Sequence, residues 1–200
     1  MKHKFLTLAA AAMMLSPQLS SEMVAQESNP FLQPYTAQYE IPPFEEIKTE
    51  HFIPALKVGI EEQTKNLEAI VNNPEAPTFD NTIMPLENLS PILDRVVAVY
   101  YHYDNAMSSP EHAAIADEIV PMIMGASNEV MLNDALFQRI KSVYDNLGKM
   151  KLDAVQKRVV EKYYRRFAEQ GAALSAEKKE ELVKVNNELS KLFIQYNRNL

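Results

Sequence analysis

The stretch Ser175–Leu200 reads SAEKKEELVKVNNELSKLFIQYNRNL. Its apolar residues recur mostly at intervals of three or four positions, the spacing that places side chains on one face of an α-helix. Ser175 is a favourable N-cap, because its hydroxyl accepts a hydrogen bond from the first helical turn. The apolar stripe consists of Leu182, Val185, Leu189, Leu192, Phe193, Tyr196 and Leu200, and the opposite face carries Lys178, Lys179, Glu180, Lys184, Asn187, Glu188, Lys191 and Arg198.

An apolar stripe of this length needs a second surface to cover it. That surface could lie earlier in the chain. However, neither Gly nor Pro ends the pattern, which still runs at Leu200. We therefore expect these residues to be the opening part of a longer protein, in which later residues cover the stripe and carry the chemistry.

The composition favours a folded, helical and soluble chain. Hydrophobic residues make up 46% of the chain and charged residues 24%, which is enough apolar material for a core. Gly is scarce, at 4 residues, whereas good helix formers are common. The net charge of −7 and the lack of a basic stripe argue against nucleic-acid binding. The absence of Cys excludes disulfides and thiolate chemistry.

The N-terminus has the pattern of a secretory signal peptide over residues 1–25. A basic start, Met1–Lys4, precedes the apolar run Phe5–Leu15, which is too short to span a bilayer. Met23–Ala25 offers a small residue before Gln26, although Met at the −3 position leaves the exact cut open. We expect export to the periplasm or beyond, without a membrane anchor, since no Cys follows the run for lipid attachment. A buried N-terminal helix is the alternative.

Residues 26–43 contain four prolines among polar residues, which predicts an extended leader. The domain of residues 44–200 follows. Its first helix begins at Thr49-Glu50 and runs to Asn72. The second begins near Thr78 and reaches Tyr100, frayed or kinked because it contains Pro85 and Pro91.

The remaining helices have clear start signals. Ser109-Pro110-Glu111 opens a third helix, which runs to about Leu132 with a bend near Pro121. The last three are expected from Asn133 or Asp134 to Gly148, from Asp153 to Gly171, and from Ser175 onwards. Six helices with short loops and no strand pattern predict an all-α, multi-helix array. No repeat supports a solenoid.

Four stretches in this order carry a resemblance. They are 43–55 (PFEEIKTEHFIPA), 77–83 (PTFDNTI, followed by Leu86-Glu87), 132–140 (LNDALFQRI) and 167–172 (FAEQGA). Together they resemble conserved blocks of the thimet-oligopeptidase-like zinc peptidases, and most closely the bacterial peptidyl-dipeptidase and oligopeptidase A branch. The family more often has Glu at the position of Asp80. The match extends over essentially the whole segment after the signal peptide.

The resemblance implies a much longer, largely helical enzyme that encloses a deep channel between two halves. Zinc would be held downstream by a His-Glu-x-x-His helix and a further Glu, and the motif's Glu would take a proton from the zinc-bound water. This segment would form a wall of the channel and supply no catalytic, cofactor-binding or metal-binding residue. The implied substrates are short unfolded peptides, with release of C-terminal dipeptides. Alternatives are a stand-alone exported helical module that binds a partner or dimerises, and a relative that has lost the zinc motif.

Several local features have both a functional and a structural interpretation. His51, His102 and His112 lack the spacing of metal-ligand pairs, so hydrogen bonding at the surface or between helices is the simpler role. The cluster Tyr100–Tyr103 could line a channel or pack one side inwards. Met122, Met124 and Met131 could form an adaptable binding surface or fill the core.

Two charged features remain. Lys162, Arg165 and Arg166 could attract a substrate carboxylate, but cations near a helix C-terminus are also favoured by the helix dipole. Asp80 is expected to support the first turn of a helix, close to its free backbone N–H groups.

Overall fold

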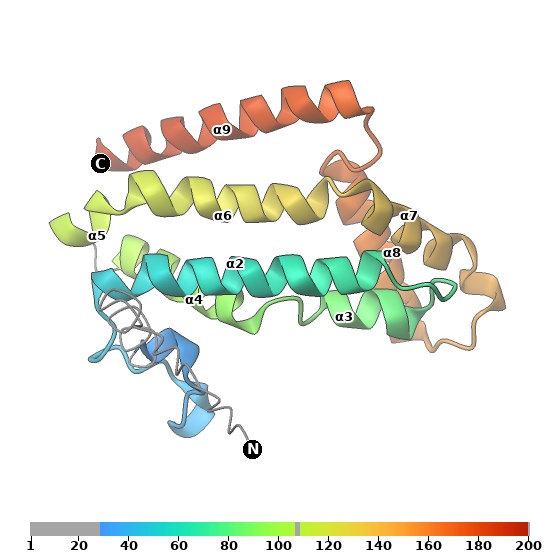
Figure 1. Ribbon diagram of the computed structural model, residues 1–200, viewed down its shortest axis with the longest axis horizontal. Helices are drawn as coiled ribbons and strands as arrows, with labels where there is room; N and C mark the ends of the chain where they lie inside the picture. The colour runs from blue at the N-terminus through green and yellow to red at the C-terminus, as the bar shows by residue number, and fades with distance from the viewer. Residues whose placement is uncertain (1–28, 107–108, 200) are drawn as a thin grey trace, which may run out of the picture.

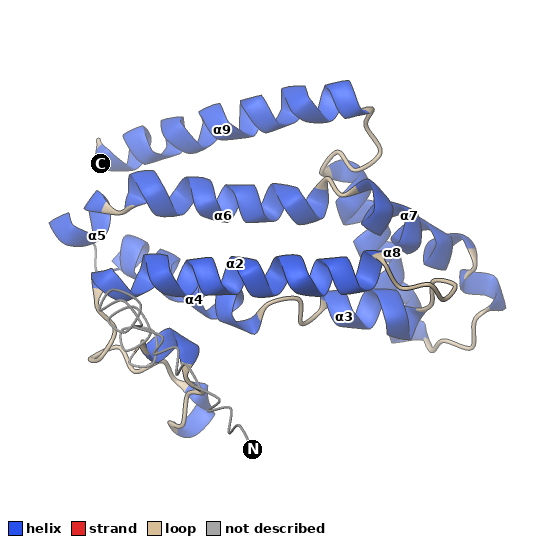
Figure 2. Cartoon of the chain, in the orientation of Figure 1, coloured by secondary structure: helices blue, strands red, loops and turns tan. Residues whose placement is uncertain are grey.

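The computed structural model describes residues 29–106 and 109–199, and these form helices and no strand (Figures 1 and 2). The predicted all-α class is therefore confirmed. The predicted signal peptide lies outside the described residues. The elements in chain order are η1 (Pro30–Leu32), η2 (Gln38–Glu40), α2 (Thr49–Val71), the π-helical turn η3 (Phe79–Ile83), α3 (Met84–Leu86), α4 (Pro91–Ala106), α5 (Pro110–Ala114), α6 (Ala116–Met131), α7 (Asp134–Asp145), η4 (Leu147–Lys149), α8 (Ala154–Glu169) and α9 (Ala176–Arg198).

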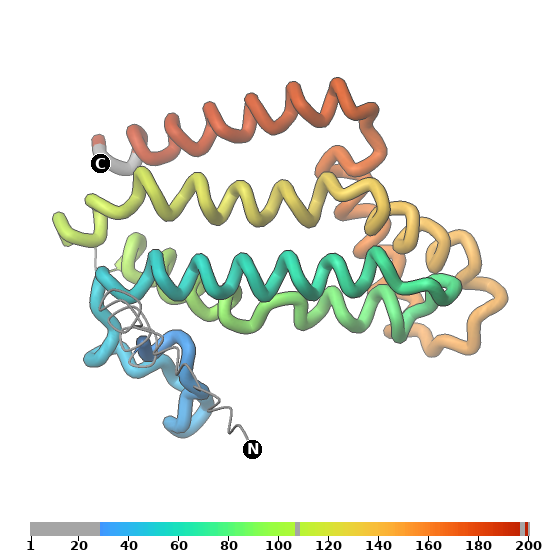
Figure 3. The backbone as a smooth tube through the Cα atoms, in the orientation of Figure 1, coloured from blue at the N-terminus to red at the C-terminus, as the bar shows by residue number. Residues whose placement is uncertain are grey.

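The long helices α2, α6 and α9 lie side by side, and α9 forms one edge of the molecule (Figure 3). α2 and α6 run in the same direction, whereas α9 returns antiparallel to α6. α4 packs along α2 on the side away from the viewer, and η3, α3, α7 and α8 gather at the far end of α2 (Figure 1).

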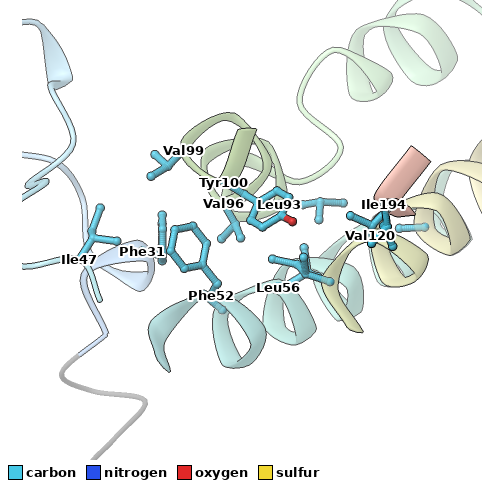
Figure 4. Packing of buried hydrophobic residues seen from close by; sticks show 13 residues of the cluster. Phe31, Ile47, Phe52, Leu56, Leu93, Val96, Val99, Tyr100, Val120 and Ile194 are labelled. Carbon is cyan, nitrogen blue, oxygen red and sulfur yellow. The ribbon is translucent and has the colours of Figure 1, made fainter. Parts of the chain in front are cut away.

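α2 is the central helix because it contributes to both hydrophobic clusters. In the first cluster, Phe52, Ala55 and Leu56 pack against side chains of α4 and α6 (Figure 4). In the second, Leu67 and Ile70 pack against η3, α7 and α8. Gly59 lies between these two contact regions, where α2 crosses α4. A Cβ atom there would lie 2.7 Å from the backbone N of Leu93, so only glycine permits this approach.

Several predicted helix ends are confirmed in detail. Asn133 and Asp153 cap α7 and α8 by accepting hydrogen bonds from the backbone N–H groups of Leu136 and Gln156. Ser175 caps α9 in the same way. Gly171 has a φ of +99°, the left-handed conformation that ends a helix and that glycine adopts readily.

The predicted second helix is wrong, because it is divided. Pro91 is the first residue of the separate helix α4, where its missing N–H costs nothing. The hydroxyl of Ser90 caps this helix by accepting a hydrogen bond from the N–H of Leu93, at 3.2 Å. The break therefore starts a helix and is not a kink.

Two further expectations need correction. The third helix is interrupted at Ile115, where the backbone N–H groups of Glu118 and Ile119 both bond to the Ile115 carbonyl, while α6 continues through Pro121. α7 ends at Asp145, and Gly148 lies in the short helix η4 that follows.

The proline-rich segment is more than an extended leader. Phe31, in η1, is fully buried, and its ring lies 5.0 Å from that of Phe52. The side chain of Asn29 caps this turn and donates a hydrogen bond to the carbonyl of His51. The segment thus closes one end of the first hydrophobic cluster, and the prolines gave no sign of this.

Candidate functional site

The outward face of α9 is the most exposed apolar surface of any helix in the described part of the chain. Five large side chains of the predicted stripe are 45–62% exposed: Val185, Leu189, Leu192, Phe193 and Tyr196. Leu182, at the start of the stripe, is partly buried. A contiguous patch of this kind indicates an interaction surface. For these five side chains, the expectation that the rest of the described chain leaves the stripe uncovered is confirmed, whereas Leu200 lies outside the described residues.

α9 is held on α6 through an adjacent face that is largely polar. Ile194 is a buried apolar residue of this face, and Ser190 is also buried. The Asn186 amide donates to the Asn128 amide oxygen at 2.9 Å. Lys179 was expected in solvent but is only 8% exposed, because its ammonium group binds the Leu132 carbonyl and the Asp134 carboxylate. Because these polar groups have partners, α9 can turn its more apolar stripe outwards.

The three basic residues of α8 line a second surface feature. Lys162, Arg165 and Arg166 are exposed and surround a cavity of about 550 Å³ together with Glu87, Val159, Tyr163, Glu169 and Gln170. The sequence identified this basic group but gave no indication of the cavity, which depends on how α8 packs beside the Glu87–Ser90 turn.

An adjoining apolar cavity of about 440 Å³ shares Tyr163 and Arg166 with the first. Its walls come from α4, α6 and α8 and include Leu93, Val97, Ile123, Val130 and Phe167. Burial and a hydrogen bond to Glu87 contribute to raising the pKa of Tyr163 to about 12, so its hydroxyl is protonated at neutral pH. Burial, followed by the nearby Glu62 carboxylate, raises the pKa of Asp94 on the cavity wall.

The three histidines considered as metal ligands make packing contacts or hydrogen bonds within the fold. Nδ1 of His51 accepts a hydrogen bond from the Lys48 backbone N–H at 3.1 Å. His102 is exposed, with its ring 5.4 Å from that of Phe44. His112 is buried. Across residues 29–106 and 109–199, no three His, Asp or Glu side chains come together in an arrangement that could hold a metal ion. The zinc that the resemblance implies therefore has no ligand set among the described residues.

The aromatic and methionine clusters are mainly packing residues. Tyr100 is 1% exposed, and the Tyr103 hydroxyl donates to the Phe44 carbonyl at 3.0 Å. The three methionines are partly buried against the two hydrophobic clusters, as expected of core filler, and Met131 also lines the apolar cavity. Asp80 is in the first turn of η3, where Thr78 and Asn81 make the capping hydrogen bonds.

His112 occupies an aromatic cage at the start of α5. It is 2% exposed, stacks on Tyr100 and Tyr103, and contacts Phe52 edge-on. Burial lowers the pKa of His112 from its ordinary value of 6.5, although Asp104 and a hydrogen bond to the Tyr100 backbone oppose the shift. Nε2 has no hydrogen-bond partner. The folded protein therefore favours the neutral ring.

We expect the stability of the protein to fall as the pH drops below about 6.5. In that range the unfolded chain takes up a proton at residue 112 that the folded chain resists, since its pKa is lower when folded. The urea midpoint of unfolding, measured from pH 8 to pH 5.5, should decrease in the unsubstituted chain and change less in a His112→Phe variant. The exposed His102→Asn variant is the control. If the midpoints of the unsubstituted chain and of His112→Phe changed equally with pH, His112 would not be the source of the pH dependence.

The helices in the described part of the chain are not suited to crossing a bilayer, since none of them is both long and apolar enough.

Comparison with known proteins identifies the family. The family model "Neurolysin/Thimet oligopeptidase, N-terminal domain" matches residues 53–179. Dipeptidyl carboxypeptidase of Salmonella typhimurium is 34% identical over 173 residues, which cover 86% of this chain and 25% of the relative. The Escherichia coli dipeptidyl carboxypeptidase is 32% identical over 172 residues, and E. coli oligopeptidase A is 27% identical over 173 residues. Each of these two matches also covers 86% of this chain and 25% of the relative.

The chain spans about a quarter of the length of these relatives. The match includes most of the helical array and three of the four blocks in full, which confirms the resemblance found in the sequence. Because the family model covers well over half of the residues, the chain belongs to the neurolysin/thimet oligopeptidase family and corresponds to the N-terminal region of its members.

Proposed function

We propose that this chain is the N-terminal domain of an exported zinc metallopeptidase that cleaves short peptides and releases dipeptides from their C-termini. The higher identity to dipeptidyl carboxypeptidases than to oligopeptidase A favours dipeptide release over internal cleavage. The signal-peptide pattern of residues 1–25 favours export. We assign zinc binding to residues outside this chain, in the longer peptidase of which this chain would be the N-terminal domain, called the parent below.

The exposed apolar face of α9 is the observation that carries this proposal. Leu189, Leu192 and Tyr196 are each more than half exposed, so covering them would stabilise an interface by roughly 1 kcal/mol per side chain. The relatives are about three and a half times as long as this chain, since 173 aligned residues make up 25% of the first of them. In the parent protein, the catalytic portion would supply the covering surface, and α9 would connect the two parts.

The role of this domain in the parent is mechanical. Its helices would form one wall of the substrate channel and admit peptides while excluding folded proteins by size. Binding and orientation of the peptide would draw on the surface of α4, α6 and α8, whereas proton transfer and carbonyl polarisation belong to the zinc site.

Removal of the metal from the parent protein tests the function. We expect the parent to release C-terminal dipeptides from an N-blocked tetrapeptide, to lose nearly all of this activity with a chelator, and to regain it when zinc is restored. Mass spectrometry of the products measures the site of cleavage. Cleavage that persists without metal, or a parent that binds no zinc and is inactive, would overturn the proposal.

A helical binding module is the second candidate, favoured by the spacing on α9. The apolar stripe, which begins at the partly buried Leu182 and continues through the exposed Val185, Leu189, Leu192 and Tyr196, alternates intervals of three and four residues, the pattern of a coiled-coil seam. A second copy of the chain could therefore cover it. Analytical ultracentrifugation of the 200-residue chain distinguishes the candidates: a well-folded, concentration-independent dimer supports the module, whereas weak self-association that is abolished in the parent supports the peptidase domain.

A further inference from the structure

We propose that the two adjoining cavities beside α8 bind the free C-terminal carboxylate of a peptide whose last side chain is large and apolar. The carboxylate would lie in the cavity lined by Lys162, Arg165 and Arg166, and the side chain would enter the apolar cavity between α4, α6 and α8. The choice of a peptide as ligand rests on the proposed peptidase function.

α8 presents free positive charge to the first cavity. Lys162, Arg165 and Arg166 lie three and four positions apart and so share a face of α8. Within the described residues, none of them is within 4.0 Å of a carboxylate, whereas Arg158 on the same helix pairs with Glu161 at 2.9 Å. In a chain with a net charge of −7, three unpaired cations around one cavity are complementary to an anion.

Two carboxylates also line this cavity. Glu87 and Glu169 reduce its positive charge but do not cancel it. Glu87 is also engaged by a hydrogen bond with Tyr163. Arg165 and Arg166 remain available, and a guanidinium group binds a carboxylate through two parallel N–H···O hydrogen bonds.

The arrangement of the two cavities sets the orientation of the ligand. The cavities meet at Tyr163 and Arg166, so a carboxylate held at Arg166 places the neighbouring side chain at the mouth of the apolar cavity. The Asp94 carboxyl group on the wall of that cavity repels a second carboxylate. The volume of about 440 Å³ and walls such as Leu93 and Phe167 suit an aromatic or branched aliphatic side chain.

A carboxylate can come from a peptide C-terminus or from an acidic side chain, and three peptides separate these sources. They are N-acetyl-Ala-Phe with a free C-terminus, the same peptide as its C-terminal amide, and N-acetyl-Ala-Asp amide. Each is titrated into the full ¹⁵N-labelled chain with a chelator present, so that no hydrolysis occurs. The readout is the set of α8 backbone resonances.

We expect only the free acid to shift resonances of α8, with affinity weakened roughly tenfold in Arg166→Gln and in Lys162→Gln, because each loses a charge-assisted hydrogen bond. Arg158→Gln, which removes the same charge from the same helix, should leave the affinity within about twofold. All three residues are exposed, and Arg158 is paired at the surface, so thermal unfolding of the variants should match that of the unsubstituted chain.

Three results would each overturn the site: binding of the amide as tightly as the acid, binding of the Asp peptide instead of the free acid, or equal weakening by Arg158→Gln. Absence of any shift up to about 10 mM peptide would do the same, since weaker binding has no use at ordinary substrate concentrations. The titration measures binding without cleavage. A negative result would therefore exclude this binding site but would not test the zinc-dependent activity proposed for the parent.

Discussion

Replacement of Gly59 by alanine is expected to lower the free energy of unfolding by about 2 kcal/mol, even though alanine is the better helix former. The new Cβ would lie 2.7 Å from the backbone N of Leu93 and 2.8 Å from its Cα. These backbone atoms cannot rotate away, so α2 and α4 must separate. The Ser90 hydroxyl, which donates to the Gly59 carbonyl at 2.8 Å, would shift as well. Urea unfolding followed by circular dichroism measures the change.

Gly125 provides a matched control in α6, because a Cβ there would meet no atom within 4 Å. Gly125→Ala should therefore stabilise the chain by roughly 0.5–1 kcal/mol through helix propensity alone. The two variants make the same chemical change in helix interiors and should move the midpoint in opposite directions. If Gly59→Ala were as stable as the unsubstituted chain, α2 and α4 would not cross as closely as described.

The helix ends were the most predictable part of the fold. Ser175, Asp153 and Asn133 act as caps where their side chains can bond the first turn, which is a local property that the sequence alone contains. The start of α4 at Pro91 was missed although Pro is favoured at the first helical position. The apolar pattern on both sides of Pro91 continues with one period, so periodicity favoured a single helix.

Long-range packing was less predictable. Nothing around Gly59 indicates that another backbone lies against it, and nothing around Phe31 indicates that it is a core residue. On α9, the stripe was identified correctly, but its buried neighbour face was not. Lys179 and Asn186 are polar, and their burial depends on the Asp134 carboxylate, the Leu132 carbonyl and the Asn128 amide. Such partners come from distant segments, which a periodic pattern cannot reveal.

The candidate site was predictable only in its charge. The basic group of α8 was recognised from its spacing, whereas the two cavities arise where α8 meets α4, α6 and the turn before α4. The same limit applies to Arg139. Its side chain is 9% exposed and holds a loop, yet its sequence context is that of an ordinary amphipathic helix.

Replacement of Arg139 by methionine is expected to cost about 2–3 kcal/mol and to loosen the connection between α2 and η3. Nη1 donates to the carbonyls of Asn73 and Glu75, at 2.9 and 3.3 Å, and Nη2 donates to the Asn81 side-chain oxygen at 3.2 Å. Hydrogen bonds from a charged donor contribute about 1.5–3 kcal/mol each at most, and loss of the buried charge offsets part of this. Methionine keeps the apolar volume of the stem, so lost packing contributes little.

Hydrogen exchange locates the effect, because Arg139 acts on a single loop. Amides between Asn73 and Ile83 should lose protection in Arg139→Met well before those of α9, which Arg139 does not contact.

Lys141→Met on the same helix is the control: its ion pair with Asp145 is exposed, so the free energy of unfolding should change by less than about 0.5 kcal/mol. A uniform loss of protection would mean that Arg139 supports the whole second cluster, and unchanged protection in the loop would show that the three hydrogen bonds do not hold it. Because Asn81 also caps η3 through its bond with the Thr78 N–H, an Asn81→Ala change should reproduce the loop opening while leaving the buried guanidinium with two of its three acceptors.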